Sequence, residues 1–330
     1  MKAKMAIIGA TGSAYKRTIP QLADSAFCEV TAIQGRDVEK LKKISNEFQI
    51  GAIYTDEREL IEREDYDLIY IANPPFMHFQ SFMNVLRKRG TPVIMEKPLD
   101  VDYANGERYR DYIGAPFMVA HHLRHQTAYR DLKTHLGRGT IGQVLNVYCQ
   151  WGFALNPKSS NSVWKRDRVL GGGGTFSDNG IHTVDLILGL FGKPERVAGH
   201  ALRANGFPVY DNETAMLLYR DKTVTLSSSH TMEYPGNHLL IYGTKGKIEA
   251  FGAMGERSIR SIRITTAEGE RNIGYPEECL YRAEVENFVR KYIFGEDIPY
   301  DGTTYEEAMT ALRIVDLARK SGETDTIYRL

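Results

Sequence analysis

Cysteine, an excess of charge of one sign and long hydrophobic runs are all scarce in this sequence. Only three cysteines occur in 330 residues, and because Cys28, Cys149 and Cys279 form no CxxC pair, neither a disulfide framework nor a zinc knuckle is expected. The charges balance at 42 basic and 42 acidic residues, which argues against nucleic acid or an acidic membrane surface as the main partner. The longest apolar runs, such as Leu68–Ala72 and Pro92–Met95, are too short to span a bilayer. With no hydrophobic signal segment ahead of the first apolar run, these absences favour a soluble protein of the reducing cytoplasm.

The first 120 residues alternate short apolar runs with helical segments, one of which is expected over Val38–Phe48. The runs expected to form strands are Met5–Ile8, Val30–Ile33, Leu68–Ala72, Val93–Met95 and Phe117–Ala120. Continuous apolar strands between helices indicate a parallel sheet that is covered on both faces. The sequence therefore predicts an α/β domain with a parallel sheet over residues 1–120.

Residues 121–330 have a different character, with one expected helix over Tyr129–Leu136 and then several strands separated by short turns. The expected strands are Val144–Trp151, Val197–Leu202, Thr214–Tyr219, Thr223–Ser228 and Leu239–Tyr242. This spacing favours an α+β domain with a large open, mostly antiparallel sheet. Two amphipathic helices, with apolar faces at Val285–Ile293 and Ala308–Val315, are expected to cover that sheet. The second domain is predicted to bind a small molecule and to mediate assembly into a homodimer or homotetramer.

A glycine-containing turn, Gly9–Ala14, directly follows the first expected strand. Small residues there let the backbone approach a pyrophosphate, and the next helix offers its N-terminal N–H groups. The usual fingerprint is GxGxxG or GxGxxA, whereas here Thr11 takes the second glycine position and Gly12 comes one place late. The predicted cofactor contacts in this turn are Gly9, Thr11, Gly12, Ser13 and Ala14. An ordinary tight turn between strand and helix is the alternative.

The end of the second strand indicates which dinucleotide is preferred. The acid that binds the ribose usually stands roughly twenty residues after the turn, a position that falls here at Gly35. No carboxylate is present there, and Arg36 follows it. Because arginine forms bidentate, charge-assisted bonds to phosphate, Arg36 favours NADP, with NAD still possible. Two alternatives stay open: Arg36 is a solvated loop charge, or Asp37 binds the ribose.

Three further motifs occur in a characteristic order along the chain. Ala72–Pro75 with His78 comes first, Glu96–Pro98 follows, and Gly172–Gly174 then leads into the DxGxHxxD motif of Asp178–Asp185. EKP alone is a weak tripeptide, but EKP with DxGxHxxD at this separation is specific. The set resembles the glucose–fructose oxidoreductase, inositol dehydrogenase and rhizopine-catabolism (Gfo/Idh/MocA) family over essentially the whole chain.

The resemblance implies a Rossmann domain followed by a domain that carries the substrate site on an open sheet. It implies that Lys97 lies near the nicotinamide and the substrate hydroxyl, and that Asp178 and His182 contact the substrate. The cofactor contacts that it adds are Ala72, Asn73, Pro74, His78, Glu96 and Lys97. A Trp-Arg pair is common before the glycine run, and this chain instead has Trp164, Lys165 and Arg166, which are further candidate substrate contacts.

Hydride transfer to a carbonyl creates an alkoxide that needs a proton donor, and the reverse reaction needs a base. His182 suits this task because its pKa lies near working pH, and Lys97 suits it if its surroundings lower its pKa. Asp178 and His182 are four residues apart, so on a helix they share one face. Structural alternatives are a helix N-cap for Asp178, a packing role for Asp185 and a cap or a cofactor contact for His78.

Four more residues cluster after the last Rossmann strand. His121, His122 and His125 have no carboxylate or cysteine beside them at ligand spacing, so no metal is predicted. Arg124, in the same stretch, is a candidate substrate contact.

The sequence is interpreted as that of an NAD(P)-dependent oxidoreductase acting on CH–OH groups, a dehydrogenase or ketoreductase for a sugar, sugar nucleotide or cyclitol. Two alternatives stay open, namely an NAD-dependent glycoside hydrolase that uses transient oxidation and a non-catalytic Rossmann ligand sensor.

Overall fold

The computed structural model describes residues 1–63, 65–88, 90–156, 163–204 and 208–330. The chain separates into two compact units, which are described in turn. The first unit comprises Met1–His122 and Tyr281–Ala308, and the second comprises Leu123–Leu280 and Met309–Leu330. The sequence had placed everything after residue 120 in the second domain, whereas the contacts of Tyr281–Ala308 lie with the first unit.

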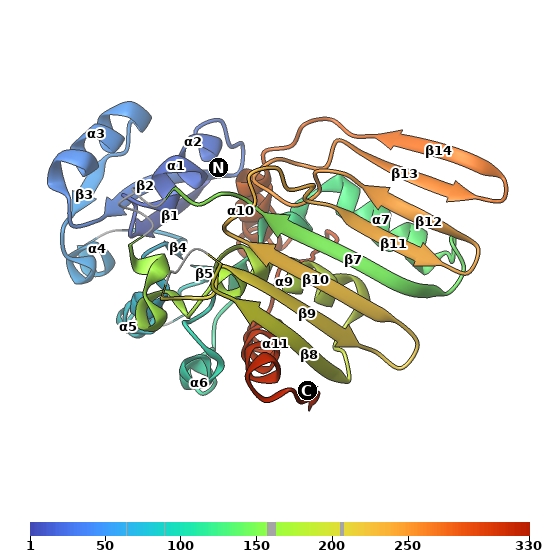
Figure 1. Ribbon diagram of the computed structural model, residues 1–330. Coiled ribbons are helices and arrows are strands. Elements are labelled where there is room, and N and C mark those ends of the chain that lie inside the picture. The colour runs from blue at the N-terminus through green and yellow to red at the C-terminus, as the bar shows by residue number, and fades with distance from the viewer. Residues whose placement is uncertain (64, 89, 157–162, 205–207) are drawn as a thin grey trace. The chain divides into compact units, whose positions relative to one another are not determined.

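Within its described residues, the first unit is built on a six-stranded parallel sheet with the order β3-β2-β1-β4-β5-β6 (Figure 1). The strands are β1 (Ala3–Ile8), β2 (Cys28–Gln34), β3 (Ala52–Tyr54), β4 (Leu68–Ile71), β5 (Val93–Glu96) and β6 (Phe117–Ala120). The strand order reverses between β1 and β4, and ligands of such sheets bind outside the carboxyl ends of the strands at this point. The predicted Rossmann sheet is therefore confirmed.

Helices cover both faces of this sheet, as the continuous apolar strands predict. Their bounds are α1 (Ser13–Lys16), α2 (Thr18–Leu22), α3 (Val38–Phe48), α4 (Glu57–Arg63), α5 (Pro75–Val85) and α6 (Tyr103–Gly106). The core of one face joins alternate residues of β1, such as Met5 and Ile7, with Leu41 and Ile44 of α3. Alternation along β1 places Ala6 and Ile8 on the opposite face.

A helix late in the sequence completes this core. The apolar stripe of α10 (Leu280–Phe288) and the following π-helical turn η6 (Val289–Ile293) presents Val285, Phe288 and Val289 to the same cluster as the β1 side chains. Ser25 Oγ donates to Glu286 Oε1 at 2.7 Å. The expectation that this helix covers the second sheet was wrong, because an amphipathic pattern shows that a face is buried but not what buries it.

Within its described residues, the second unit has a nine-stranded sheet with the order β14-β13-β12-β11-β7-β10-β9-β8-β15. The strands are β7 (Val144–Gly152), β8 (Arg196–Leu202), β9 (Asn212–Leu218), β10 (Thr223–Ser229), β11 (Leu239–Gly243), β12 (Gly246–Ala250), β13 (Ser261–Thr266), β14 (Gly269–Gly274) and β15 (Tyr328–Arg329). Neighbours pair antiparallel except β7 and β10, which are parallel. The sheet is thus mostly antiparallel, as predicted.

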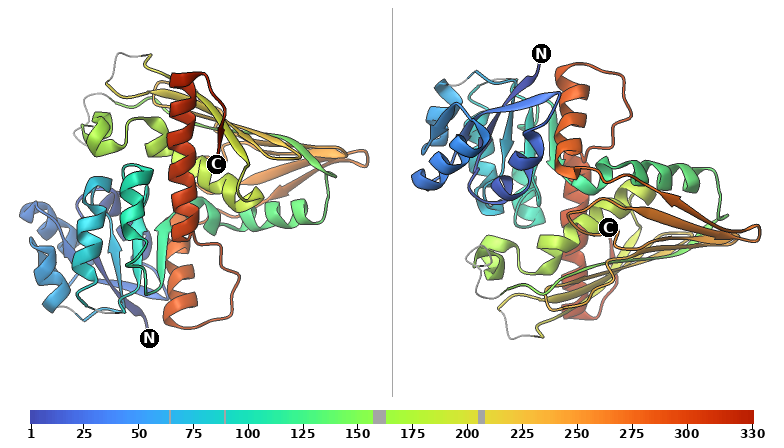
Figure 2. Two further views of the ribbon diagram at one scale, coloured as in Figure 1. Left: turned by 90° about the horizontal axis from the view of Figure 1, so that it is seen from below. Right: turned by 90° about the horizontal axis from the view of Figure 1, so that it is seen from above.

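Within the described residues, helices lie on only one face of the second sheet (Figure 2). These are α7 (Thr127–Gly137), α9 (Ile181–Phe191) and the second half of α11 (Tyr305–Thr324). On the bare face, β7 exposes Tyr148 while its neighbours Val147 and Cys149 are buried beneath the helices. No described helix is both long and apolar enough to cross a membrane.

Candidate functional site

The turn after β1 contains a glycine that no other residue could replace. Gly9 has a backbone φ of +80°, and a Cβ there would overlap the backbone of Asn73, lying 2.7 Å from its Cα. At Gly12, by contrast, a Cβ would meet no atom within 4 Å among the described residues beyond its chain neighbours. Thr11 precedes Gly12 in this turn, and Ser13 and Ala14 begin α1. A close backbone approach with free space beside it fits a dinucleotide pyrophosphate.

The position expected to hold a ribose-binding acid is Gly35, which has no side chain and packs against Thr11. A Cβ at Gly35 would lie 2.8 Å from Thr11 Cγ2. Arg36 is exposed, and within the described part of the chain its guanidinium has no ion-pair partner. Asp37, the alternative ribose ligand, is the N-cap of α3, where its Oδ1 accepts from the Lys40 backbone nitrogen at 3.0 Å. The cation at Arg36 is therefore available at this strand end, whereas the Asp37 carboxylate is engaged.

His78 of α5 ties together the loops that follow β4 and β5. Its Nε2 lies 2.8 Å from the Asn73 carbonyl oxygen, and its Nδ1 lies 3.2 Å from that of Leu99. Burial lowers the pKa of His78, and a neutral imidazole can donate to only one of these oxygens. Ala72 and Pro74 flank Asn73 in the loop after β4. Because both ring nitrogens face backbone carbonyls, His78 has a positioning role in these loops.

Glu96 fixes the backbone that carries Lys97 at the end of β5. Its buried carboxylate accepts from the Tyr70 hydroxyl at 2.9 Å and from the Lys97 backbone nitrogen at 3.2 Å. Burial, together with the charges of Glu96 and Glu284, raises the pKa of Tyr70, which keeps the phenol a donor. The Lys97 side chain is half-buried, and the peptide bond between Lys97 and Pro98 is cis. Lys97 therefore follows β5 on a braced backbone at the ligand-binding edge of the sheet.

In the second unit, Asp178 is the centre of a charged cluster. It lies in the π-helical turn η5 (Phe176–Gly180), which leads into α9. Lys165 Nζ, from the short turn η4 (Trp164–Arg166), donates to both carboxylate oxygens at 2.7 Å. His230 Nε2 lies 3.2 Å from Asp178 Oδ2. The cap residue of α9 is Gly180, so Asp178 does not serve as an N-cap.

Two aromatic rings lie beside the imidazoles of this unit. His182, four residues after Asp178, stacks on Trp151 with ring centroids 5.0 Å apart and an interplanar angle of 30°. The Phe153 ring lies 5.1 Å from that of His230. His182 and His230 are both buried. The second unit thus brings together a carboxylate, an ammonium group, two imidazoles and two aromatic rings.

Glycines in and after the glycine run allow this cluster to form. A Cβ at Gly171, the last residue of α8 (Arg168–Gly171), would lie 2.6 Å from the Trp164 carbonyl oxygen and 2.9 Å from Lys165 Cα. A Cβ at Gly180 would lie 2.9 Å from Ser228 Cβ on β10. Glycine at these positions therefore lets η4 and η5 pack closely against their neighbours.

A buried ion pair holds the segment that contains the glycine run in place. Arg319 Nε on α11 donates to Glu213 Oε1 at 2.6 Å, and its Nη1 donates to the Gly172 carbonyl oxygen. Glu213 Oε2 in turn accepts from the Phe176 backbone nitrogen at 2.7 Å. This pair ties α11 and β9 to both ends of the glycine run.

Not every residue predicted to bind substrate lies in this cluster. Arg124 is only 3% exposed; its Nε donates to Asp185 Oδ2 and its Nη2 to the Asp185 carbonyl oxygen, both at 2.7 Å. This buried pairing fits the structural alternative for Asp185, while a substrate contact for Arg124 stays a prediction. Trp164 and Arg166 are half-buried on either side of Lys165, whose Nζ lies 5.7 Å from the centre of the Trp164 ring.

The histidines before α7 belong to the packing of the chain. His121, His122 and His125 are buried, and His122 stacks on Tyr281 with ring centroids 4.6 Å apart. Among the described residues, no three His, Cys, Asp or Glu side chains are grouped so that they could hold a metal ion.

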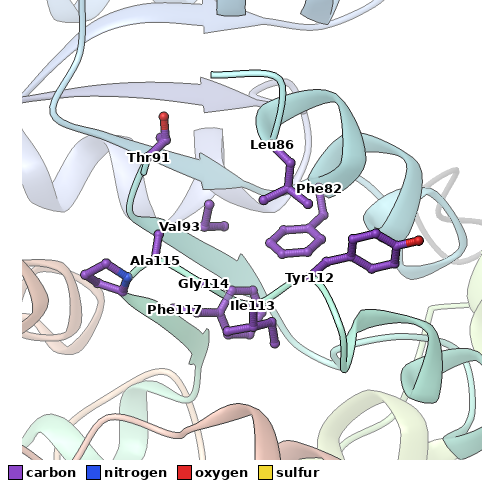
Figure 3. A pocket seen from close by; sticks show the side chains of 10 residues that line it. Phe82, Leu86, Thr91, Val93, Tyr112, Ile113, Gly114, Ala115 and Phe117 are labelled. Atoms are coloured by element: carbon purple, nitrogen blue, oxygen red, sulfur yellow. The ribbon is translucent and has the colours of Figure 1, made fainter. Parts of the chain in front are cut away.

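A small apolar hollow lies elsewhere in the first unit (Figure 3). Its empty space, part of which is open solvent, amounts to about 180 Å³, and it is lined by Phe82 and Leu86 of α5, by Val93 and by residues 112–117. These segments precede β5 and β6, so the hollow lies at the opposite ends of the strands from Asn73 and Lys97. It is too small for a dinucleotide and is lined by no charged side chain, so it is no part of the candidate site.

Sequence reasoning missed His230, which follows a plain Ser227–Ser229 run and carries no motif. The position of His230 is set by the parallel pairing of β10 with β7, in which Ser228 lies opposite Trp151 and Ser229 opposite Gly152. That register carries His230 alongside Phe153. A sequence signal for it would have required knowledge of this pairing.

Comparison with known protein families agrees with both halves of this arrangement. Residues 3–113 match the NAD-binding Rossmann fold model of the oxidoreductase family, and residues 129–249 match the GFO/IDH/MocA C-terminal domain. The chain belongs to the Gfo/Idh/MocA oxidoreductase family. It is thus an NAD(P)-dependent oxidoreductase with a Rossmann domain, which confirms the resemblance read from the EKP and DxGxHxxD motifs.

Relatives of this Gfo/Idh/MocA protein match along nearly its whole length. A D-xylose 1-dehydrogenase (NADP(+)) of Haloferax volcanii is 26% identical, covering 98% of each chain. A scyllo-inositol 2-dehydrogenase (NADP(+)) of Bacillus subtilis is 25% identical, covering 96% of each. The aldose-aldose oxidoreductase of Caulobacter crescentus, solved with glycerol, has the same fold with a TM-score of 0.88 over both complete chains at 21% identity.

Proposed function

We propose that this protein transfers a hydride between nicotinamide and a hydroxyl- or keto-bearing carbon of a sugar, sugar nucleotide or cyclitol. The observation that carries the proposal is the Asp178 cluster of the second unit, in which Lys165 holds the carboxylate and His182 follows four residues later. A carboxylate, imidazoles and aromatic rings suit a polyhydroxylated ligand, which offers hydroxyl donors and apolar C–H faces. Relatives named for xylose and scyllo-inositol support the same substrate class.

Proton handling is proposed for Lys97 and His182. His182 donates a proton to the oxygen of a carbonyl substrate, or accepts one from an alcohol, because imidazole titrates near neutral pH. Lys97 stabilises the alkoxide through its ammonium group, and the buried Glu96 holds the backbone from which it extends. The Asp178 carboxylate accepts a hydrogen bond from a substrate hydroxyl, and Lys165 fixes the orientation of that carboxylate. Trp164 and Arg166 are proposed to border the substrate.

The first unit is proposed to hold the dinucleotide, which when bound supplies the hydride acceptor or donor. The pyrophosphate would lie against the backbone of the Gly9–Ala14 turn, beside the free space at Gly12. NADP is the proposed cofactor because Gly35 excludes a competing carboxylate and Arg36 offers a cation to the 2′-phosphate.

The test is a screen of sugars, sugar nucleotides and cyclitols with NADP and NAD, followed by absorbance of the reduced nicotinamide. We expect Lys97→Ala and His182→Ala to lose about 10²–10⁴-fold in turnover while still binding NAD(P)H, as general acid–base groups do. Asp178→Asn is expected to be intermediate. Near-parental turnover by Lys97→Ala on the true substrate would remove the proposed catalytic role. Glycoside cleavage without net change in absorbance would favour the hydrolase alternative.

A further inference from the structure

A chain of hydrogen bonds runs from the loop after β4 through α5 to α4. Asn73 Nδ2 donates to Ser81 Oγ of α5 at 2.7 Å, and Ser81 Oγ donates to Glu57 Oε2 of α4 at 2.7 Å. The other oxygen of Glu57, Oε1, accepts from Asn84 Nδ2. Ser81 and Asn84 are 1% and 4% exposed, whereas Glu57 is half-buried, so water is excluded from the donor side of these bonds. Glu57 therefore accepts two buried donors.

The carboxylate at the end of this chain sets the direction of every bond in it. An ionised carboxylate only accepts, so Ser81 must give its single hydroxyl proton to Glu57. With that proton committed, Ser81 accepts from Asn73 and cannot donate to it. The Asn73 amide is therefore fixed with its NH₂ group toward Ser81 and its carbonyl oxygen pointing elsewhere.

That carbonyl oxygen accepts no hydrogen bond from the described part of the protein. Asn73 is 9% exposed, and its Oδ1 is buried without a hydrogen-bond partner among the described residues. A buried acceptor that stays unpaired is costly, so a built site for an N–H or O–H donor is indicated. Asn73 follows β4 and touches Gly9 after β1, which places it at the reversal of strand order where such sheets bind ligands.

We propose that Glu57 is a positioning residue for the nicotinamide half of the dinucleotide. Through Ser81 it presents Asn73 Oδ1 to a donor on that half, either the carboxamide NH₂ or a ribose hydroxyl. The nicotinamide half is indicated because the β1 turn and the end of β2 serve the adenosine half, and β4 begins the second mononucleotide-binding half of the sheet. The proposal rests on the proposed function.

The test measures binding and needs no substrate. NADPH and NADH are titrated by their fluorescence, and 2′,5′-ADP, which lacks the nicotinamide riboside, is titrated by calorimetry. Glu57→Gln leaves a single acceptor oxygen for two donors, so we expect about a five- to tenfold loss of NADPH affinity, the loss of one net hydrogen bond. Binding of 2′,5′-ADP should not change. Glu59→Gln, on the same helix but paired with Arg63 at the surface, is the matched control and should match the parent.

A second variant tests the direction of the bonds and not merely their presence. The double variant Glu57→Gln with Asn84→Asp should restore the parental NADPH affinity. In it, the amide NH₂ introduced at position 57 donates to the carboxylate introduced at position 84. The amide oxygen at position 57 is then free to accept from Ser81. Failure of this rescue, an equal loss of 2′,5′-ADP affinity, or parental NADPH affinity in Glu57→Gln would each overturn the inference. If the parent protein binds no dinucleotide, the proposed function falls and the inference falls with it.

Discussion

Among single residues, His78 couples the stability of the first unit to pH. Burial lowers its pKa, so the folded protein favours the neutral imidazole, which donates to one of the carbonyl oxygens of Asn73 and Leu99. In an unfolded chain, histidine has a pKa of about 6.5. The stabilisation by neutral His78 is therefore present above that pH, and it is lost as the pH falls toward the lower pKa of His78 in the folded protein. We expect His78→Gln to lower the free energy of unfolding by about 1–3 kcal/mol at neutral pH.

Thermal unfolding between pH 5 and 8 checks this expectation. The melting temperature of the parent should fall more steeply on acidification than that of His78→Gln, so that the two curves converge at low pH. His200→Gln, at an exposed position on β8, serves as the control and should keep the parental slope. Parallel curves for the parent and His78→Gln would contradict the role of the neutral imidazole.

We propose that Arg36 determines the choice between NADP and NAD. Because its guanidinium is exposed beside Gly35, Arg36→Ala should weaken NADP binding by about 10- to 100-fold, the value of a charge-assisted bond, with little change for NAD. Isothermal titration with both dinucleotides measures the difference. Arg58→Ala, which removes another exposed arginine of the same unit, should leave both affinities unchanged. Equal losses for both dinucleotides in Arg36→Ala would show that this cation does not bind the 2′-phosphate.

Sequence patterns point to residues whose chemistry lies in a motif, and they miss residues that strand pairing brings close to such a motif. Lys97, Asp178 and His182 are predicted site residues because EKP and DxGxHxxD are local patterns. His230 reaches Asp178 only through the register of β10 with β7, which no local pattern encodes. Arg124 was predicted to face the substrate because of its position in the chain, but burial against Asp185 depends on tertiary packing.

At the scale of elements, the close approach of η4 to α8 depends on Gly171. A methyl group there would meet the backbone of Trp164 and Lys165, and backbone cannot move aside as a side chain can. We expect Gly171→Ala to displace Lys165 from Asp178 and to lower kcat/KM by about tenfold or more, since it disturbs a charge-assisted pair. Dinucleotide affinity should not change.

Gly137→Ala is the matched control for this prediction. Gly137 is likewise the last residue of a helix, and a Cβ there would meet nothing within 4 Å among the described residues outside that helix. Kinetics of both variants, with thermal unfolding to confirm folding, make the comparison. Parental kcat/KM in Gly171→Ala would show that η4 tolerates displacement or takes no part in the site.

Elements with a strong local pattern were predicted closely. Helix α3 and strand β6 have the predicted bounds, because an amphipathic period with an Asp37 cap and a short apolar run are each sufficient signals. Strands β12 to β14 were not predicted. Charged and glycine residues weaken the apolar pattern of β12 and β14, although β13 does alternate Ile262 and Ile264 with polar residues. The partner of α10 was misjudged because periodicity specifies a buried face and not its contact.

At the scale of the whole molecule, the bare face of the second sheet exposes aromatic and apolar side chains that another protein surface could bury. Tyr148 and Tyr242 pack edge to face there with centroids 6.0 Å apart, and Met216 is also exposed on this face. We propose that two copies of the chain pair through this surface, since exposed apolar patches mark interaction sites. Tyr148→Arg should shift the mass measured by light scattering at micromolar concentration toward the monomer.

Tyr112→Arg is the control for this experiment, because Tyr112 is as exposed as Tyr148 but lies in the first unit. It should leave the oligomer intact. A parent protein that is already monomeric, or a Tyr148→Arg variant with the parental mass, would contradict pairing through the sheet.

The most direct test of the proposed hydride transfer is to label the hydride. The parent protein is incubated with a keto-sugar or keto-cyclitol taken from the screen and with NADPH that carries deuterium at both C4 positions, and the product is examined by mass spectrometry and NMR. We expect one deuterium per product molecule, bonded to the former carbonyl carbon, with an equal loss of reduced-nicotinamide absorbance. A product that contains no deuterium would contradict the proposed transfer.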